Sequence, residues 1–192
     1  MKYIRNFTLS FILFSTSLLS QNGKVIQLRK DNIKEVVASL TLEEKIHLVM
    51  GNNNNEWRKN IGVGSTWESA KHGITPAILD DGPAGLRIKA KREDDAKTYY
   101  CTAFPTATAL SATWNTELVE HVGKSMGNEV LEYGSDVLLA PAINIHRNPL
   151  CGRNFEYYSE DPLLSGKLGA AMVRGIQSNG VGTSVKHFGD VS

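Results

Sequence analysis

The chain has 192 residues, of which 41% are hydrophobic and 21% are charged. This composition excludes a collagen-like fibre and a largely disordered chain. The 21 basic and 20 acidic residues nearly cancel, giving a formal net charge of +1. Neither nucleic acid nor an anionic membrane surface is therefore an expected partner.

The first 20 residues have the pattern of a secretory signal peptide. Lys2 and Arg5 precede a mostly apolar run over residues 7–19. This run is shorter than the roughly 20 apolar residues of a membrane-spanning helix. We therefore expect residues 1–20 to be removed on export, which would leave residues 21–192 as a periplasmic or extracellular chain that is free of the membrane.

Two short amphipathic helices are expected between residues 31 and 50. Apolar residues recur there at helical spacing. Thr41 and Glu44 form a capping box that predicts the start of the second helix. Gly51 and the four asparagines at 52–55 are typical of a helix end and a polar loop. We expect irregular chain from there to about Thr75.

Three short apolar runs follow, at residues 76–79, 136–140 and 181–185. Runs of this kind are typical of strands that are buried on both faces of a parallel sheet. Between the first two, apolar residues repeat every four positions over 118–130, which predicts a helix with Asn115 as its N-cap.

A second long helix is predicted between the last two runs. Asp161 can cap it, Pro162 suits its first position, and Asn179-Gly180 can end it. The resulting order of strand, helix, strand, helix, strand belongs to an α/β fold, either an open doubly wound sheet or a (β/α)8 barrel. Neither the glycine pattern of a dinucleotide fold nor that of a P-loop occurs in the sequence.

The two cysteines, Cys101 and Cys151, stand outside any Cys-x-x-Cys or Cys/His cluster. Metal binding is therefore not expected. Export would permit a disulfide between them, but the sequence is equally compatible with two buried free thiols.

Polar residues collect after each of the three expected strands. They include Asp81 and Arg87 after the first, Arg153 after the second, and Lys186 and His187 after the third. In a barrel these stretches share the rim at the carboxyl ends of the strands, where barrel enzymes keep their active sites. The neighbouring Asp80 should point to the opposite side of the strand.

The side-chain types at this rim suit a polyol. A carboxylate accepts hydrogen bonds from hydroxyl groups, while guanidinium, ammonium and imidazole groups donate them. A phosphate would also suit Arg and Lys, but it would gain nothing from Asp81. We therefore expect a sugar as the substrate.

Four stretches of the sequence carry extended motifs. They read DGPAGLR at 81–87, FPTATALSATWN at 104–115, LAPAINIHRNPLCGRNFEYYSEDP at 139–162 and KHF at 186–188. Together they resemble the amino-terminal domain of glycoside hydrolase family 3, the β-glucosidase group, over about residues 30–188. The resemblance implies the first part of a (β/α)8 barrel, hence an incomplete TIM-type barrel. It also implies retaining hydrolysis of β-linked glucosides or oligosaccharides without a cofactor.

The resemblance further implies which residues would bind the non-reducing glycosyl unit in the −1 subsite. These are Asp81, Arg87, Arg153, Lys186 and His187.

The catalytic pair is expected to lie outside this chain. A retaining glycosidase needs a nucleophile and an acid about 5 Å apart, and the resemblance places both beyond Ser192. The family usually continues after Lys-His-Phe with an Asn and a Gln-Glu pair, whereas here Gly189-Asp190 follow. This difference predicts a truncated chain that is inactive alone. Glu156, Glu160 and Asp161 are poor substitutes, since the last two read as a helix start.

Other activities stay open. A β-xylosidase of the same family differs in whether the subsite accommodates a C6 hydroxymethyl group. A β-N-acetylhexosaminidase is disfavoured, because that branch places a Pro-Gly-His-Gly loop where this chain has 188–190. A third alternative is a truncated product that only binds sugar or has no function.

Overall fold

The structure is a computed structural model that describes residues 25–52, 62–93 and 95–187. The predicted signal peptide lies outside these residues. One sheet holds all five described strands in the order β1-β2-β3-β4-β5. The strands are β1 (Gly51–Asn52), β2 (Gly64–Thr66), β3 (Ile78–Asp81), β4 (Val137–Leu139) and β5 (Gly182–Thr183).

The predicted α/β class is confirmed, with a sheet that is mixed in direction. β3, β4 and β5 are parallel neighbours and correspond to the three predicted strands. β1 and β2 pair antiparallel with each other, and β2 pairs antiparallel with β3. The prediction of irregular chain up to Thr75 was wrong here, because strands of two and three residues are too short to show an alternating pattern.

Four of the five α-helices in the described residues begin where the sequence predicts them, whereas the short helix at 107–111 was not predicted. The five are α1 (Ile33–Ser39), α2 (Leu42–Val49), α3 (Ala107–Ser111), α4 (Thr116–Glu132) and α5 (Pro162–Gln177). The capping box of α2 is present in both directions between Thr41 and Glu44. Asn115 caps α4 and Asp161 caps α5, each by accepting a backbone N–H bond in the first turn. These short-range bonds satisfy donors that the helix itself leaves unpaired.

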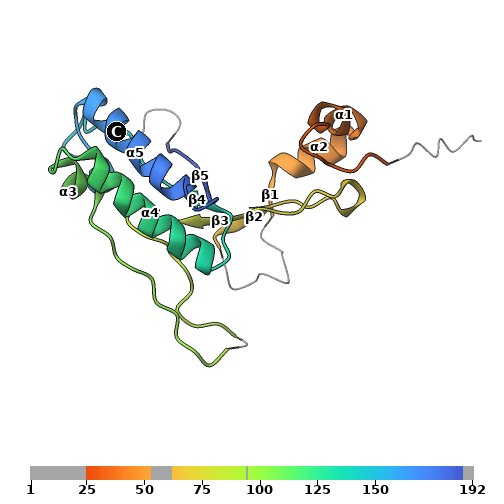
Figure 1. Ribbon diagram of the computed structural model, residues 1–192, viewed down its shortest axis with the longest axis horizontal. Coiled ribbons are helices and arrows are strands. Elements are labelled where there is room, and N and C mark those ends of the chain that lie inside the picture. The colour runs from red at the N-terminus through yellow and green to blue at the C-terminus, as the bar shows by residue number, and fades with distance from the viewer. Residues whose placement is uncertain (1–24, 53–61, 94, 188–192) are drawn as a thin grey trace, which may run out of the picture.

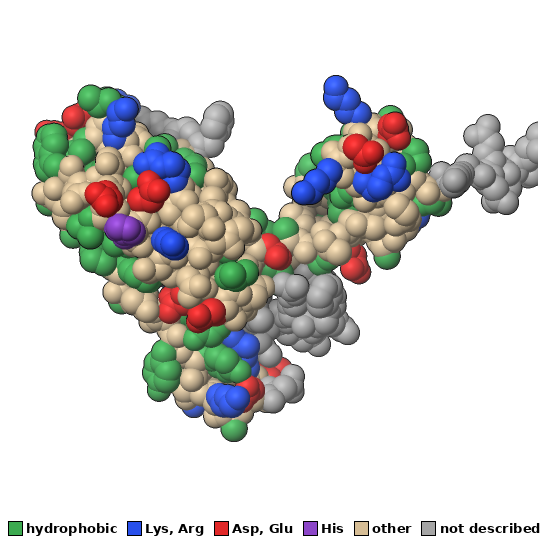
Figure 2. Space-filling model, in the orientation of Figure 1, with side chains coloured by type: hydrophobic (Ala, Val, Ile, Leu, Met, Phe, Trp, Pro, Cys, Tyr) green, Lys and Arg blue, Asp and Glu red, His purple; other side chains and the backbone are tan. Residues whose placement is uncertain are grey.

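α4 and α5 lie side by side next to the parallel strands, whereas α1 and α2 form a separate lobe beyond β1 (Figure 1). The hydrophobic core lies between the two long helices and β4, and it includes Val119, Met126, Leu138, Leu168, Met172 and Ile176. Basic and acidic side chains are intermixed on the face shown in Figure 2. Within the described ranges, none of the helices has the length and hydrophobicity needed to cross a bilayer.

The contact between α4 and α5 is close enough to require glycine. A Cβ atom on Gly175 would lie 2.2 Å from the carbonyl oxygen of Glu120, and one on Gly123 would lie 2.7 Å from the carbonyl oxygen of Met172. Backbone atoms of a neighbouring helix cannot move away as a side chain can. The packing of α4 against α5 therefore depends on glycine, which has no side chain, at positions 123 and 175.

Gly175→Ala should therefore destabilise the protein. We expect the free energy of unfolding to fall by about 1–3 kcal/mol, the cost of overpacking a tight contact, in a urea denaturation experiment. Gly166→Ala in the same helix is the matched control, because its Cβ would meet nothing within 4 Å. This second variant should be neutral or up to about 1 kcal/mol more stable, because alanine favours the helix. Equal losses in both variants would contradict the close contact.

Candidate functional site

A pocket of about 390 Å³ opens at the carboxyl end of β3. Its wall combines four separate stretches of the chain, within residues 81–87, 101–107 and 153–156 and at Lys186. The strands β3, β4 and β5 run parallel, so the segments that follow them emerge at the same edge of the sheet. Residues that are far apart in sequence therefore share one site.

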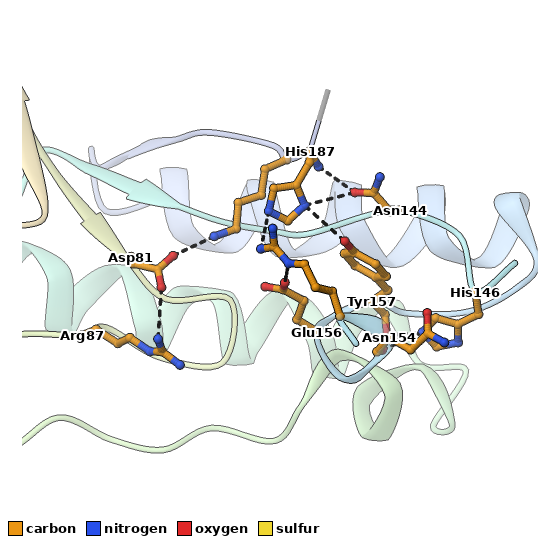
Figure 3. A network of polar contacts seen from close by, with 10 residues as sticks. Asp81, Arg87, Asn144, His146, Asn154, Glu156, Tyr157 and His187 are labelled. Carbon is orange, nitrogen blue, oxygen red and sulfur yellow. Dashed lines mark hydrogen bonds and ion pairs between the residues drawn. The ribbon is translucent and has the colours of Figure 1, made fainter. Parts of the chain in front are cut away.

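Asp81 is the carboxylate at the base of this pocket. Lys186 Nζ donates to Asp81 Oδ1 at 2.7 Å, although the two residues are 105 positions apart in sequence. Arg87 Nη1 lies 3.5 Å from Asp81 Oδ2. Figure 3 shows Asp81 between these two cations. Lys186 is mostly buried, with 17% of its side chain exposed, whereas Arg87 is 74% exposed and reaches into solvent.

The turn after β3 holds Asp81 and Arg87 together. The backbone N–H of Arg87 donates to the carbonyl oxygen of Asp81 at 2.9 Å. Gly85 in this turn has a φ of +124°, and a Cβ there would lie 2.3 Å from the carbonyl oxygen of Thr102. Glycine is thus required both for the backbone conformation and for the close approach of the next wall segment.

Asp80 points away from the pocket, as the alternation along a strand predicts. Its side chain is fully buried and accepts a hydrogen bond from the Ser135 hydroxyl. Burial raises the pKa of Asp80 above its ordinary value, and the neighbouring charge of Asp81 adds to this shift. The two adjacent carboxyl groups thus occupy different environments.

Arg153 also lines the pocket and is held by two partners. Its Nε donates to Glu156 Oε1 at 2.5 Å, and its Nη2 lies 2.6 Å from His187 Nε2. Glu156 belongs to the short 3-10 helix η3 (Asn154–Glu156) and is only 8% exposed. The hydrogen bond that Arg153 donates to Glu156 raises the pKa of Arg153 above its ordinary value, so the guanidinium stays charged.

His187 lies behind Arg153 rather than in the pocket wall. The other four predicted site residues, Asp81, Arg87, Arg153 and Lys186, line the pocket directly. The backbone N–H of His187 donates to Asn144 Oδ1 at 2.7 Å. Burial lowers the pKa of His187, and the positive charge of Arg153 lowers it further.

Sequence reasoning included Asn144 in the polar stretch after the second strand without giving it a role, and it considered Glu156 only as a substitute catalytic group. Both residues lie in the dense polar stretch 144–156, which was the available signal. Their contacts reach across to Arg153 and His187, and no local spacing pattern reveals such pairs.

The remaining wall of the pocket is largely apolar and includes Leu86, Ala103 and Phe155. Phe155 is 61% exposed. Cys101 also lines the pocket. Cys101 and Cys151 are not joined in a disulfide, and burial raises the pKa of Cys101. Among the residues that the structure describes, no group of three His, Cys, Asp or Glu side chains is arranged to hold a metal ion.

Known proteins match the chain over most of its length. Residues 83–191 match the family model described as the glycosyl hydrolase family 3 N terminal domain. The thermostable beta-glucosidase B of Acetivibrio thermocellus is 41% identical over 163 residues. The exo-alpha-(1->6)-L-arabinopyranosidase of Bifidobacterium longum is 44% identical over 156 residues.

A solved structure also matches. Beta-glucosidase 3B from Thermotoga neapolitana, in complex with alpha-D-glucose, is 54% identical and superposes with a TM-score of 0.76. The match covers 82% of this chain and 23% of the solved one. The A. thermocellus and B. longum matches cover 82% and 79% of this chain, but only 20% and 19% of those relatives. The chain thus spans about a fifth of their length.

The buried carboxyl group of Asp80 should make the stability of the protein depend on pH. A group whose pKa is raised by folding stabilises the fold below its ordinary value, here 3.8, and does so less as pH rises through the folded value. Asp80→Asn keeps an oxygen for Ser135 but cannot ionise. Its free energy of unfolding should therefore rise relative to wild type as pH increases from about 4 to 7.

Urea denaturation at several pH values measures this difference. Asp31→Asn, at an exposed carboxylate, controls for the loss of one negative charge. If the difference in the free energy of unfolding between Asp80→Asn and wild type stays constant with pH, folding does not raise the pKa of Asp80.

Proposed function

Because the chain belongs to glycosyl hydrolase family 3, we propose that its pocket binds the non-reducing glucosyl unit of a β-linked glucoside as part of a retaining β-glucosidase. The observation that carries this proposal is the convergence of Asp81, Lys186 and Arg153 in one pocket. These groups come from segments that follow three different parallel strands.

The carboxylate of Asp81 can serve two sugar hydroxyl groups. Lys186 contacts one of its oxygens and Arg87 contacts the other. Because a carboxylate has about four acceptor positions, each oxygen keeps capacity for a further hydrogen bond. The two cations also fix the orientation of the carboxylate, which lowers the entropic cost of binding.

Arg153 supplies hydrogen-bond donors to the same pocket. A guanidinium has five N–H groups, so Arg153 keeps donors for a ligand beyond the two that Glu156 and His187 accept. Leu86, Ala103 and Phe155 offer an apolar wall for the C–H face of a pyranose ring. Such a mixture of apolar wall and few fixed polar groups is typical of small-molecule sites.

The nucleophile and the acid/base are proposed to lie outside this chain. A retaining mechanism needs two carboxyl groups about 5 Å apart that are available for reaction. The two carboxylates that line the pocket are already engaged, Asp81 with Lys186 and Arg87, and Glu156 with Arg153. On this proposal, the parallel strands β3, β4 and β5 are the first strands of a (β/α)8 barrel. The chain is further proposed to be exported after removal of residues 1–20.

A pentopyranoside is the second candidate substrate. The B. longum relative is named for an L-arabinopyranoside, and its identity to this chain is similar to that of the glucosidases. The β-xylosidase alternative belongs to the same class, since xylose also lacks the C6 hydroxymethyl group. Competition of xylose and L-arabinose with glucose for the pocket decides between these sugars.

Asp81→Asn should weaken glucose binding to the chain without unfolding it. The turn is kept because Arg87 donates to the backbone oxygen of Asp81. The loss of charge-assisted hydrogen bonds, at about 1.5–3 kcal/mol, should lower the affinity roughly tenfold to a hundredfold. Saturation-transfer NMR with glucose measures the affinity, and circular dichroism checks the fold.

The control is Asp31→Asn, whose exposed carboxylate lies in the lobe of α1 and α2 and which should bind glucose as wild type does. An aryl β-glucoside should not be hydrolysed by the purified chain, because on this proposal the nucleophile and the acid/base lie outside it. Folded wild-type chain that binds no monosaccharide, or hydrolysis abolished by a substitution within residues 25–187, would contradict the proposal.

A further inference from the structure

The contacts of His187 determine which of its ring nitrogens carries the proton. Its Nε2 lies 2.6 Å from Arg153 Nη2. A guanidinium only donates hydrogen bonds, so Nε2 must offer its lone pair. The proton of the neutral ring then belongs on Nδ1. An imidazolium would set two positively charged donors against each other at this distance.

The partners of Nδ1 agree with this assignment. Asn144 Oδ1 lies 3.3 Å from His187 Nδ1, and the Tyr157 hydroxyl lies 3.5 Å from it. The orientation of the Asn144 amide is fixed because the backbone N–H of His187 donates to the same Oδ1 at 2.7 Å, and only the oxygen of an amide accepts. Asn144 thus accepts from both the backbone and the ring of one residue.

Glu156 in turn holds Arg153. Its carboxylate is buried and accepts a hydrogen bond from the guanidinium Nε of Arg153. The contacts thus run from Glu156 through Arg153 and His187 to Asn144. Figure 3 shows Glu156, His187 and Asn144 in this network. Arg153 lines the pocket and His187 stands behind it. A change in the protonation or orientation of His187 therefore changes how the guanidinium of Arg153 is oriented in the pocket.

We infer that Asn144 and Glu156 are positioning residues: Asn144 holds His187 as the neutral Nδ1–H tautomer, and Glu156 together with His187 Nε2 fixes the guanidinium of Arg153 toward the pocket. The tautomer follows from contacts within the chain alone. The effect on sugar binding rests on the function proposed above.

Nitrogen-15 NMR of the ligand-free chain with labelled histidine tests the tautomer directly. His187 should show a protonated Nδ1 and an unprotonated Nε2. His146 is an internal reference with the opposite tautomer, because its Nε2 faces the carbonyl oxygens of Asn154 and Tyr157 at 2.8 and 3.1 Å and must donate to them. Asn144→Ala should reduce the Nδ1–H population of His187 and leave His146 unchanged. Tyr157→Phe should change neither.

A glucose titration then tests the positioning role. Asn144→Ala and Glu156→Ala should each weaken glucose binding about fivefold to tenfold, the effect of losing one supporting hydrogen bond. Glu156→Gln keeps an acceptor for Arg153 Nε and should restore most of this loss. Unfolding midpoints measured on the same samples separate a positioning effect from general destabilisation, because a purely structural role would give Glu156→Gln and Glu156→Ala the same affinity per folded molecule.

The possible results are distinct. If wild-type His187 carries its proton on Nε2, or on both nitrogens, the inference is overturned regardless of the result of the glucose titration. An unchanged tautomer in Asn144→Ala overturns the role of Asn144. The expected tautomers in a wild-type chain that binds no monosaccharide support the assignment of His187 and overturn the proposed sugar-binding function.

Discussion

The parallel register of β3, β4 and β5 decides where every polar side chain of the pocket lies. Asp81 pairs with Leu139, and Leu138 pairs with Thr183. Asp136 fixes where the pairing of β3 with β4 begins. Its carboxylate accepts a hydrogen bond from the backbone N–H of Ile78, and its own backbone N–H donates to the carbonyl oxygen of Ile78. A slip of β3 by one residue would exchange the two faces of the strand. The pocket would then lose the carboxylate of Asp81 and the core would lose that of Asp80.

The charged side chains of the pocket are paired with one another. Two carboxylates face three cations, which leaves one positive charge in excess, and the pKa of the histidine behind them is lowered by burial and by Arg153. Because both carboxylates are paired, a single excess positive charge remains to attract an ionic ligand. The pocket offers a fixed pattern of donors and acceptors, which suits the hydroxyl groups of an uncharged sugar. The same pairing fixes the long side chains of Lys186 and Arg153 before a ligand arrives.

The parts of the structure that follow from local chemistry were predictable from the sequence. The caps at Thr41, Asn115 and Asp161 depend on side chains within three residues of the backbone groups that they bind. The strands β1 and β2 were missed because they are defined only by their partners in the sheet. Of the five residues named from the motif resemblance, all but His187 line the pocket. The contacts of Glu156 and Asn144 depend on how η3 meets Lys186 and His187 in space.

The spacing of the pocket residues along the chain also bears on how the protein folds. The ion pair of Asp81 with Lys186 joins residues 105 positions apart, and a long helix stands between each pair of successive parallel strands. Such non-local contacts form slowly, while single helices form within about a microsecond. During synthesis α4 is therefore able to form long before Lys186 has left the ribosome. The pocket is among the last features that a nascent chain acquires.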